Sequence, residues 1–315
     1  MITKRLITII AAMSLSLTTV NAAAQADTQT PIQMNILGKP VSSEARPFVE
    51  HGTTWVPLNP TVQALGGTVI WDAPTRTARL QLWSHNAGFT VGRNTVLYER
   101  NGNKQVMKLA APIPMKNNRV YIPLRVLTQW YGYTVQEEGY SLSIQSPLSS
   151  NEALLLQGDL AKARQWVMSK GLKYAHFAHK PLPYQKEMEG SETIYLFPTG
   201  RAAPFFLISD GTATFYEWKN GFIIATWQGF VPVGSKDTLH LFLDGHIVDA
   251  TGVQPSFKAY FYYRIGELVT SRHVTAGHVD TTGNVKILGD KWSVNGEVSS
   301  QTGSFTLKLP DEARL

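Results

Sequence analysis

The chain has 315 residues, a formal net charge of +6 and no cysteine. Without cysteine it has no disulfide, no thiolate metal site, no cysteine nucleophile and no lipid-modified N-terminal cysteine. The charge is uneven, because residues 27–150 hold 11 Lys and Arg against 7 Asp and Glu, whereas residues 151–315 hold 16 of each kind. A basic first half is compatible with an anionic partner, and ordinary solubilising charge explains it more simply. Nucleic acid is not an expected partner, since no recognised binding motif for it is present.

The first 26 residues have the pattern of a secretory signal peptide. Lys4 and Arg5 give a basic start, residues 6–20 are apolar and hydroxyl-bearing, and Ala22-Ala23-Ala24-Gln25-Ala26 offers small residues to a signal peptidase. The apolar run is shorter than the roughly 20 residues that a helix needs to span a bilayer. We therefore predict cleavage after Ala24 or Ala26, a secreted or envelope-associated protein, and no membrane span in the mature chain.

The most informative feature is a motif that occurs twice, 66 residues apart. Each copy predicts a strand, a short helix that a glycine ends, and a second strand. Asn59-Pro60 is expected to start the first helix, since Asn favours the N-cap position and Pro the first helical position. The copies read Trp55-Val56-Pro57-Leu58, Leu65-Gly66 and Thr68-Val69-Ile70-Trp71, and then Tyr121-Ile122-Pro123-Leu124, Tyr131-Gly132 and Thr134-Val135.

A domain boundary is predicted at residues 146–150, which read Ser-Pro-Leu-Ser-Ser. This segment follows a completed strand pattern and precedes a helical one. The predicted domains are a stalk-like duplicated β-rich domain over residues 27–148 and a second β-rich domain over residues 149–315.

The second half begins with a helical pattern over residues 151–170 and continues as strands and tight turns. We predict about nine short strands, including residues 239–243 and 304–309. The fold class predicted for the chain is mainly β with short helices (α+β), the second half being an antiparallel meander or sandwich-like domain with one leading helix. Hairpins are expected at Asp210-Gly211, Asn220-Gly221, Asp244-Gly245 and Asn295-Gly296.

Residues 31–146 resemble the copper amine oxidase N-terminal domain-like family, also called the stalk domain. The resemblance rests on Val56-Pro57-Leu58 and Val69-Ile70-Trp71-Asp72 in the first copy, and on Ile122-Pro123-Leu124-Arg125 in the second. It implies a bacterial cell-envelope accessory module without metal ligands or chemistry of its own. In the first copy Asn59 replaces the family's Arg, and in the second Glu137-Glu138 replaces Trp-Asp, so the copies are not expected to bind one ligand equivalently. We identify no family for residues 151–315.

Histidine and aspartate give the chain its candidates for chemistry. His176 and His179 form an H-x-x-H pattern, which without a third ligand nearby does not indicate a zinc site. A second set of histidines and aspartates lies in the β-rich second half. It would support a hydrolase only if the fold brought imidazole and carboxylate side chains together in a concave pocket. This set comprises His240, His246, His273 and His278 with Asp244, Asp249 and Asp280.

Asp280-Thr281-Thr282-Gly283 is similar to an aspartic protease motif, but its extra Thr and its single occurrence favour a hairpin turn. We predict no catalytic residue, no metal and no cofactor.

Aromatic residues recur on successive predicted strands of the second half. Their rings either fill two covered faces of a sheet, the simpler interpretation, or leave some rings exposed to stack on sugars. The candidate ligand-binding residues are Trp218, Trp227, Arg119 and Arg125.

Together these patterns predict an exported, non-catalytic accessory or binding protein of the cell envelope. Its expected partner is peptidoglycan, an anionic wall polymer or another envelope protein. Two alternatives stay open: an extracellular hydrolase with its site in residues 151–315, and a scaffolding module that pairs through an exposed strand edge.

Overall fold

The computed structural model describes residues 31–42, 44–183, 191–232, 237–294, 307, 309 and 312–315. The described residues from Ile32 onward belong to one compact unit. The predicted class, mainly β with short helices, is confirmed. The predicted signal peptide lies outside the described residues, as do the turn at Asn295-Gly296 and most of the strand expected at residues 304–309.

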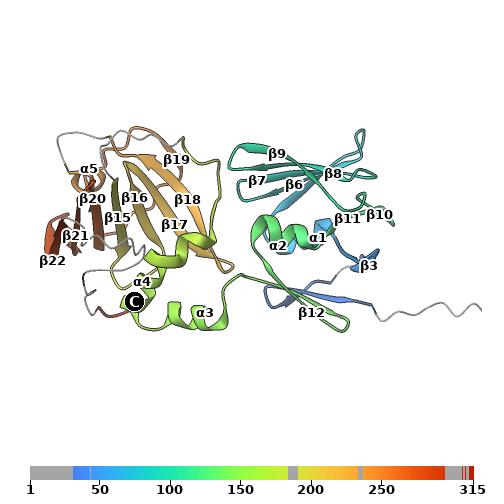
Figure 1. The fold of residues 1–315 in the computed structure, drawn as a ribbon, viewed down its shortest axis with the longest axis horizontal. Helices are drawn as coiled ribbons and strands as arrows, with labels where there is room; N and C mark the ends of the chain where they lie inside the picture. The colour runs from blue at the N-terminus through green and yellow to red at the C-terminus, as the bar shows by residue number, and fades with distance from the viewer. Residues whose placement is uncertain are drawn as a thin grey trace, which may run out of the picture. The chain divides into compact units, whose positions relative to one another are not determined.

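The first half consists of three sheets that surround two short helices (Figure 1). The sheets have the strand orders β12-β13-β1-β2, β10-β11-β4-β3 and β5-β6-β7-β8-β9. The strands are β1 (Gln33–Ile36), β2 (Lys39–Pro40), β3 (Phe48–Glu50), β4 (Thr53–Pro57), β5 (Thr68–Asp72), β6 (Thr77–Leu82), β7 (His85–Thr90), β8 (Thr95–Arg100), β9 (Asn103–Lys108), β10 (Met115–Lys116), β11 (Arg119–Pro123), β12 (Thr134–Glu138) and β13 (Ser141–Gln145).

The two copies of the motif fold alike, as the sequence predicts. β4, helix α1 (Leu58–Ala64) and β5 form the first copy, and β11, helix α2 (Arg125–Tyr131) and β12 form the second. Gly132 ends α2 with a φ of +78°, a left-handed backbone that glycine adopts without strain. The predicted start of α1 is wrong, because the helix begins at Leu58 and so includes Asn59. Pro60 is its third residue, where the backbone N–H would have no helical partner in any case.

An internal two-fold relationship joins the copies at the pairing of β4 with β11. The strands are antiparallel, with Val56 directly opposite Ile122. These two residues hold the same position in the motif, and the neighbouring pairs Trp55–Pro123 and Pro57–Tyr121 exchange under the same 66-residue shift. The copies are therefore related by a local axis that passes between Val56 and Ile122.

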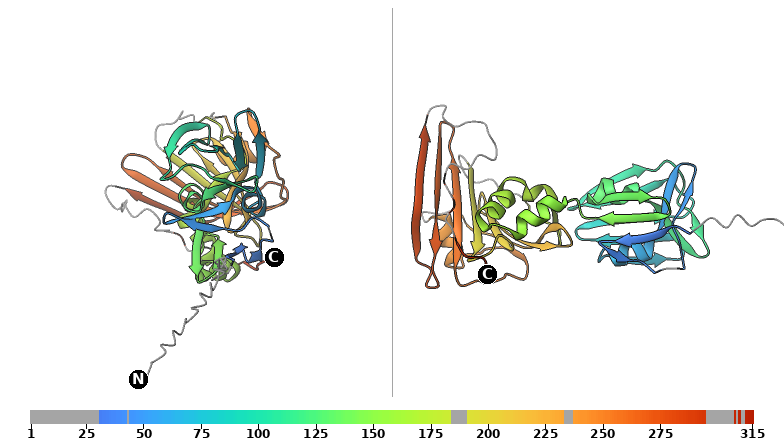
Figure 2. Two further views of the ribbon diagram at one scale, coloured as in Figure 1. Left: turned by 90° about the vertical axis from the view of Figure 1, so that its right-hand side faces the viewer. Right: turned by 90° about the horizontal axis from the view of Figure 1, so that it is seen from below.

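In the part of the second half that the structure describes, the strands form a single nine-stranded sheet with helices against it, rather than a sandwich of two sheets. Its order is β14-β18-β17-β16-β15-β20-β21-β22, with β19 also paired to β18. Neighbouring strands are antiparallel except β14 and β18. Figure 2 shows the long hairpin of β21 and β22 at one edge. The strands are β14 (Ala175–Phe177), β15 (Ser191–Pro198), β16 (Phe205–Ser209), β17 (Thr212–Lys219), β18 (Phe222–Phe230), β19 (Ala250–Gly252), β20 (Tyr260–Glu267), β21 (Ser271–Val279) and β22 (Val285–Val294).

The leading helical pattern divides into two helices, α3 (Ser150–Gln157) and α4 (Leu160–Lys170), followed by the short 3₁₀ helix η1 (Gly171–Tyr174). Ser149 and Glu152 cap α3 reciprocally, and the Asp159 side chain accepts a hydrogen bond from Lys162 N and so starts α4 anew. The strand predicted over residues 239–243 is wrong, since helix α5 (Thr238–Leu243) occupies them. The Asp244-Gly245 sequence therefore ends a helix and does not make a hairpin.

Both faces of the central strands of the large sheet are covered, and alternate residues of β16 enter different cores. Phe205 and Leu207 pack with α4 residues such as Val167, whereas Phe206 and Ile208 pack with Leu239 and Phe242 of α5. The period of two along a strand produces this division. Most aromatic rings of the second half are thus core residues, in agreement with the simpler interpretation of the sequence.

Contacts also join the residues before and after the predicted boundary. Phe222 and Ile224 of β18 belong to the buried core of the first half. Ser84 N donates a hydrogen bond of 2.6 Å to the carbonyl of Phe177. The division into domains at residues 148 and 149 stays a prediction.

Candidate functional site

Two of the grooves on the duplicated unit lie at the starts of α1 and α2. The first has a volume of about 500 Å³ and is lined by Pro57, Leu58, Asn59, Pro60, Val69, Trp71, Ala78, Met115, Asn118, Arg119 and Val120. The second has a volume of about 440 Å³ and is lined by Gly52, Thr53, Thr54, Leu124, Arg125, Thr128, Val135 and Glu137.

The internal duplication relates these grooves to each other. Seven of the eight residues that line the second groove are displaced by 66 positions from residues that line the first. Each groove takes a helix start and the following strand from one copy, and the beginning of a strand from the other copy. The corresponding pairs are Leu58 and Leu124, Asn59 and Arg125, Val69 and Val135, Trp71 and Glu137, Asn118 and Gly52, Arg119 and Thr53, and Val120 and Thr54.

The first groove offers an aromatic surface and a cation. Trp71 is 42 % exposed, although it is a large hydrophobic residue at the end of a strand. The guanidinium of Arg119 lies 3.1 Å from a carboxylate oxygen of Glu44, and both side chains are open to solvent. Such surface ion pairs contribute little stability, so Arg119 can exchange Glu44 for another anion at small cost.

The second groove presents different chemistry at the same positions. Glu137 stands where the first groove has Trp71, and Thr53 stands where it has Arg119. The hydroxyl of Thr54 donates to the Glu137 carboxylate at 3.4 Å. Arg125 supplies a cation, at the position of Asn59. The two sequence departures noted above, at residue 59 and at residue 137, therefore fall inside the grooves.

The four candidate ligand-binding residues lie at separate places. Arg119 lines the first groove and Arg125 the second. The expectation that Trp227 exposes its ring is wrong, because Trp227 is 2 % exposed and packs edge to face on Phe206. Trp218 is half-buried against Trp166. Both Trp218 and Trp227 are covered by their neighbours in the cores of the large sheet.

Trp71 is the groove residue that the sequence-based list omitted. The signal was available, because Trp71 belongs to the repeated motif and its counterpart is Glu137. Which of the many aromatic residues stay exposed depends on tertiary packing, however, and periodicity alone does not give this.

The histidines of the H-x-x-H pattern do not converge on a site. His176 is buried, stacks on Trp83 at a centroid distance of 4.2 Å, and places its ring Nε2 3.1 Å from the Tyr131 carbonyl. His179 is exposed. A third histidine that the sequence did not single out, His85, is buried in the same cluster and lies 5.2 Å from the His176 ring. Burial lowers the pKa of His176 to about 4 and that of His85 to about 3.

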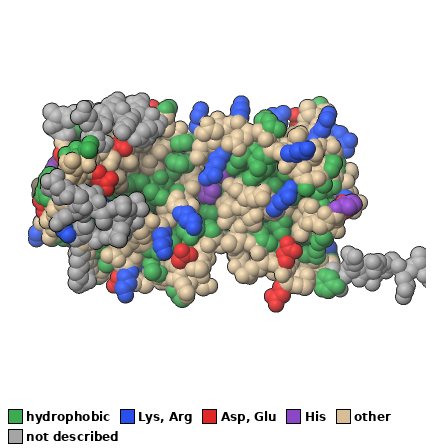
Figure 3. All heavy atoms as spheres, in the orientation of Figure 1, with side chains coloured by type: hydrophobic (Ala, Val, Ile, Leu, Met, Phe, Trp, Pro, Cys, Tyr) green, Lys and Arg blue, Asp and Glu red, His purple; other side chains and the backbone are tan. Residues whose placement is uncertain are grey.

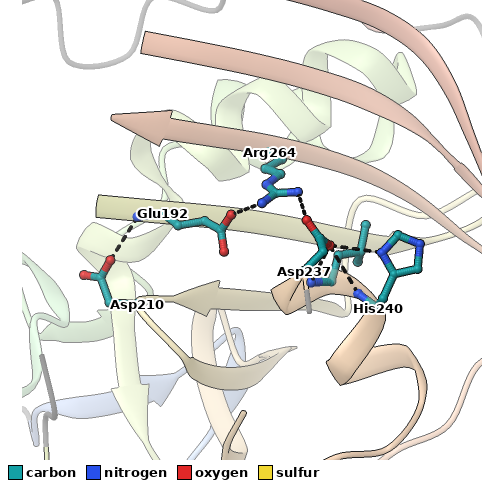
Figure 4. Close-up of polar contacts among 6 residues, drawn as sticks. Glu192, Asp210, Asp237, His240 and Arg264 are labelled. Atoms are coloured by element: carbon teal, nitrogen blue, oxygen red, sulfur yellow. Dashed lines mark hydrogen bonds and ion pairs between the residues drawn. The ribbon is translucent and has the colours of Figure 1, made fainter. Parts of the chain in front are cut away.

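A charge network in the second half involves one of the suspected histidines (Figure 4). Arg264 forms ion pairs with both Glu192 and Asp237. Asp237 also caps α5 through the backbone N–H groups of Leu239 and His240, and its Oδ1 lies 3.1 Å from the His240 ring. Burial raises the pKa of Asp237, but hydrogen bonding and the charge of Arg264 outweigh this effect and keep the pKa below its usual value.

The histidine and aspartate partners proposed for a hydrolase are not brought together. Within the described part of the chain, no side-chain hydrogen bond or ion pair joins His240, His246, His273 or His278 to Asp244, Asp249 or Asp280, and the one bond between the two groups is the backbone bond from Asp244 N to the His240 carbonyl at the end of α5. His273 instead bonds Asp290 at 2.7 Å and stacks on Trp292.

Asp280 closes the turn between β21 and β22, as the sequence predicts. It accepts hydrogen bonds from Thr282 and Asn284, and those from Thr282 are the largest cause that lowers its pKa to about 2.

The described residues contain no group of three or more His, Asp or Glu side chains placed to hold a metal ion. The helices within them are all too short or too polar to cross a bilayer. The basic side chains are spread over the face shown in Figure 3 rather than gathered in one patch.

The fold and the grooves define a β-rich protein whose first half is a duplicated, grooved module. The family model for the copper amine oxidase N-terminal domain matches residues 35–145, which confirms the resemblance for this segment. Comparison with curated proteins gave no match.

Proposed function

We propose that the protein is an exported, non-catalytic binding protein of the cell envelope. The observation that carries this proposal is the pair of corresponding grooves on a module that matches an accessory domain family. The basic start, apolar run and small residues of positions 1–26 support export.

The chemistry of the first groove favours binding over catalysis. Its described lining residues offer an indole ring, aliphatic side chains, two amides and one guanidinium, and no nucleophile paired with a base. In the second half, Asp237 is engaged in capping α5 and in pairing with Arg264. These arrangements suit a protein that holds a partner and does not transform it.

The proposed partner is a cell-wall glycan or an anionic wall polymer. The first half carries 11 Lys and Arg against 7 Asp and Glu over residues 27–150, which favours an anionic partner. Attraction of this kind between exposed charges weakens with salt, because the Debye length falls to about 8 Å at physiological ionic strength.

A sedimentation assay tests the proposal. The chain without residues 1–26 is incubated with purified cell walls at low and at high salt, and the bound fraction is measured. Retention that weakens as salt rises supports the proposal, and no retention at either salt contradicts it. Fractionation of cells that express the full chain tests export: protein confined to the cytoplasm, with residues 1–26 intact, would contradict an envelope location.

A further inference from the structure

The difference between the two grooves indicates which ligand the first one binds. Immediately after an internal duplication, both grooves have the same residues. The corresponding positions that now differ therefore show how the chemistry of the two grooves has diverged. Three changes involve charge: a ring against a carboxylate at Trp71 and Glu137, a guanidinium against a hydroxyl at Arg119 and Thr53, and an amide against a guanidinium at Asn59 and Arg125. Each change alters how a groove interacts with an anion, and only the first groove has its cation together with an aromatic ring and no carboxylate.

The first groove attracts an anion. Arg119 is the charged residue among those that line it, and no lining residue that the structure describes carries a carboxylate. Arg119 contacts the carboxylate of Glu44, and the Glu44 side chain is 91 % exposed. A ligand carboxylate can therefore replace Glu44 and form a charge-assisted pair with the guanidinium.

The remaining lining residues suit a sugar ring. The exposed face of Trp71 is flat and apolar and complements the C–H face of a pyranose. Asn59 and Asn118 are exposed amides at the groove, each able to donate to and accept from hydroxyl groups. A volume of about 500 Å³ lies within the range of small-ligand sites.

The second groove lacks this combination. It has no aromatic residue in its described lining, and Glu137 places a negative charge where the sugar would stack. Glu137 would repel an anionic sugar stacked at that position, and Arg125 offsets this charge without supplying the missing aromatic surface.

We propose that the first groove binds a carboxylate-bearing sugar of an anionic glycan, with Trp71 stacking on the ring and Arg119 pairing with the carboxylate. This assignment rests on the proposed binding function and specifies its ligand. The second groove does not share the activity.

Calorimetric titration of the chain without residues 1–26 tests the assignment. The probes are N-acetylglucosaminyl-N-acetylmuramic acid, which carries a carboxylate, di-galacturonic acid, which carries carboxylates of another source, and neutral di-N-acetylglucosamine. An acidic hexapeptide is a fourth probe. Binding of one or both carboxylated sugars supports the assignment, and their relative affinity identifies the source. Equal affinity for the neutral disaccharide, or binding of the peptide alone, overturns it.

Matched substitutions locate the site. Trp71→Ala and Arg119→Ala each weaken binding by about tenfold or more, as expected for a lost stacking contact or charge-assisted pair. Arg125→Ala and Glu137→Ala in the second groove leave the affinity within about twofold, since neither touches the ligand. Circular dichroism and the unfolding midpoint establish that each variant is folded; Arg119→Lys, which keeps the charge, retains part of the affinity. A loss caused by the second-groove variants, and not by the first-groove ones, overturns the assignment.

Wall sedimentation of the same variants separates this assignment from the proposed function. Retention that does not change on Trp71→Ala and Arg119→Ala overturns the assignment and leaves envelope binding intact. A chain that is not retained at all contradicts the proposed function itself.

Discussion

Val56 lies directly opposite Ile122 in the pairing of β4 with β11, and the two residues hold the same position in the duplicated motif. Both are fully buried. The local two-fold axis that they define explains why each groove combines residues from both copies. It also gives seven of the eleven residues that line the first groove a natural control at the corresponding residue of the second groove.

Lowering the pH should destabilise the fold through His85 and His176. Their pKa values, about 3 and about 4, lie below the 6.5 expected in the unfolded chain, which therefore binds more protons between pH 6.5 and 4. Their contribution to stability is complete above pH 6.5 and is lost as pH falls, by up to about 1.4 kcal/mol per pH unit for each histidine. Urea unfolding from pH 7.5 to 4.5 measures this dependence.

The double variant His85→Phe and His176→Phe isolates that effect from the carboxylates. The double variant should reduce the difference between the unfolding free energies at pH 7 and pH 4.5. His51→Ala, at an exposed position, should leave this difference unchanged. An identical pH dependence in wild type and double variant would contradict the prediction.

Removing the Glu312 carboxylate should strongly destabilise the second half. Arg164 is 1 % exposed and its Nη1 lies 2.7 Å from Glu312, so Glu312→Ala leaves a buried charge without its carboxylate. We expect a loss of about 3 kcal/mol or more in unfolding free energy. Glu217→Ala breaks the exposed pair with Lys219 and should cost less than about 1 kcal/mol. Comparable costs for the two variants in denaturant titrations would refute this prediction.

Asp237→Ala should lower the free energy of unfolding more than Asp237→Asn does. Asp237→Ala removes both the cap of α5 and the pair with Arg264, whereas Asp237→Asn keeps an oxygen that can accept from Leu239 N and His240 N. The cap accounts for about 1 kcal/mol of the difference in unfolding free energy. Thermal unfolding of both variants tests the order; equal loss would show that the ion pair dominates.

Limited proteolysis should cut the chain within residues 146–150, between β13 and α3. The two fragments should remain associated in size-exclusion chromatography under native conditions, because Phe222 and Ile224 belong to the core of the first half. Phe222→Ala should promote their separation. A chain that resists cleavage there while being cut elsewhere would contradict the predicted boundary.

The repeated motif made the first half predictable, because a strand, a short helix and a glycine stop are all encoded locally. The local sequence pattern was less informative where the same residues are compatible with both a strand and a helix. Residues 239–243 alternate well enough for a strand, yet Asp237 caps a helix there and Leu239 and Phe242, three residues apart, both enter the core. The grooves were out of reach for a different reason, since Trp71 and Arg119 are 48 positions apart in the sequence and meet only through the pairing of the two copies.

The shared construction of the grooves has a consequence for how such a module can change over generations. A single copy could complete its groove only by pairing with a second copy, and two identical copies would give two identical grooves. Once the two copies are joined in one chain, their sequences can differ, and the two grooves no longer have to be identical. Residues 71 and 119 can then change without altering residues 137 and 53, so that one groove can acquire a ligand while the other is free to lose it.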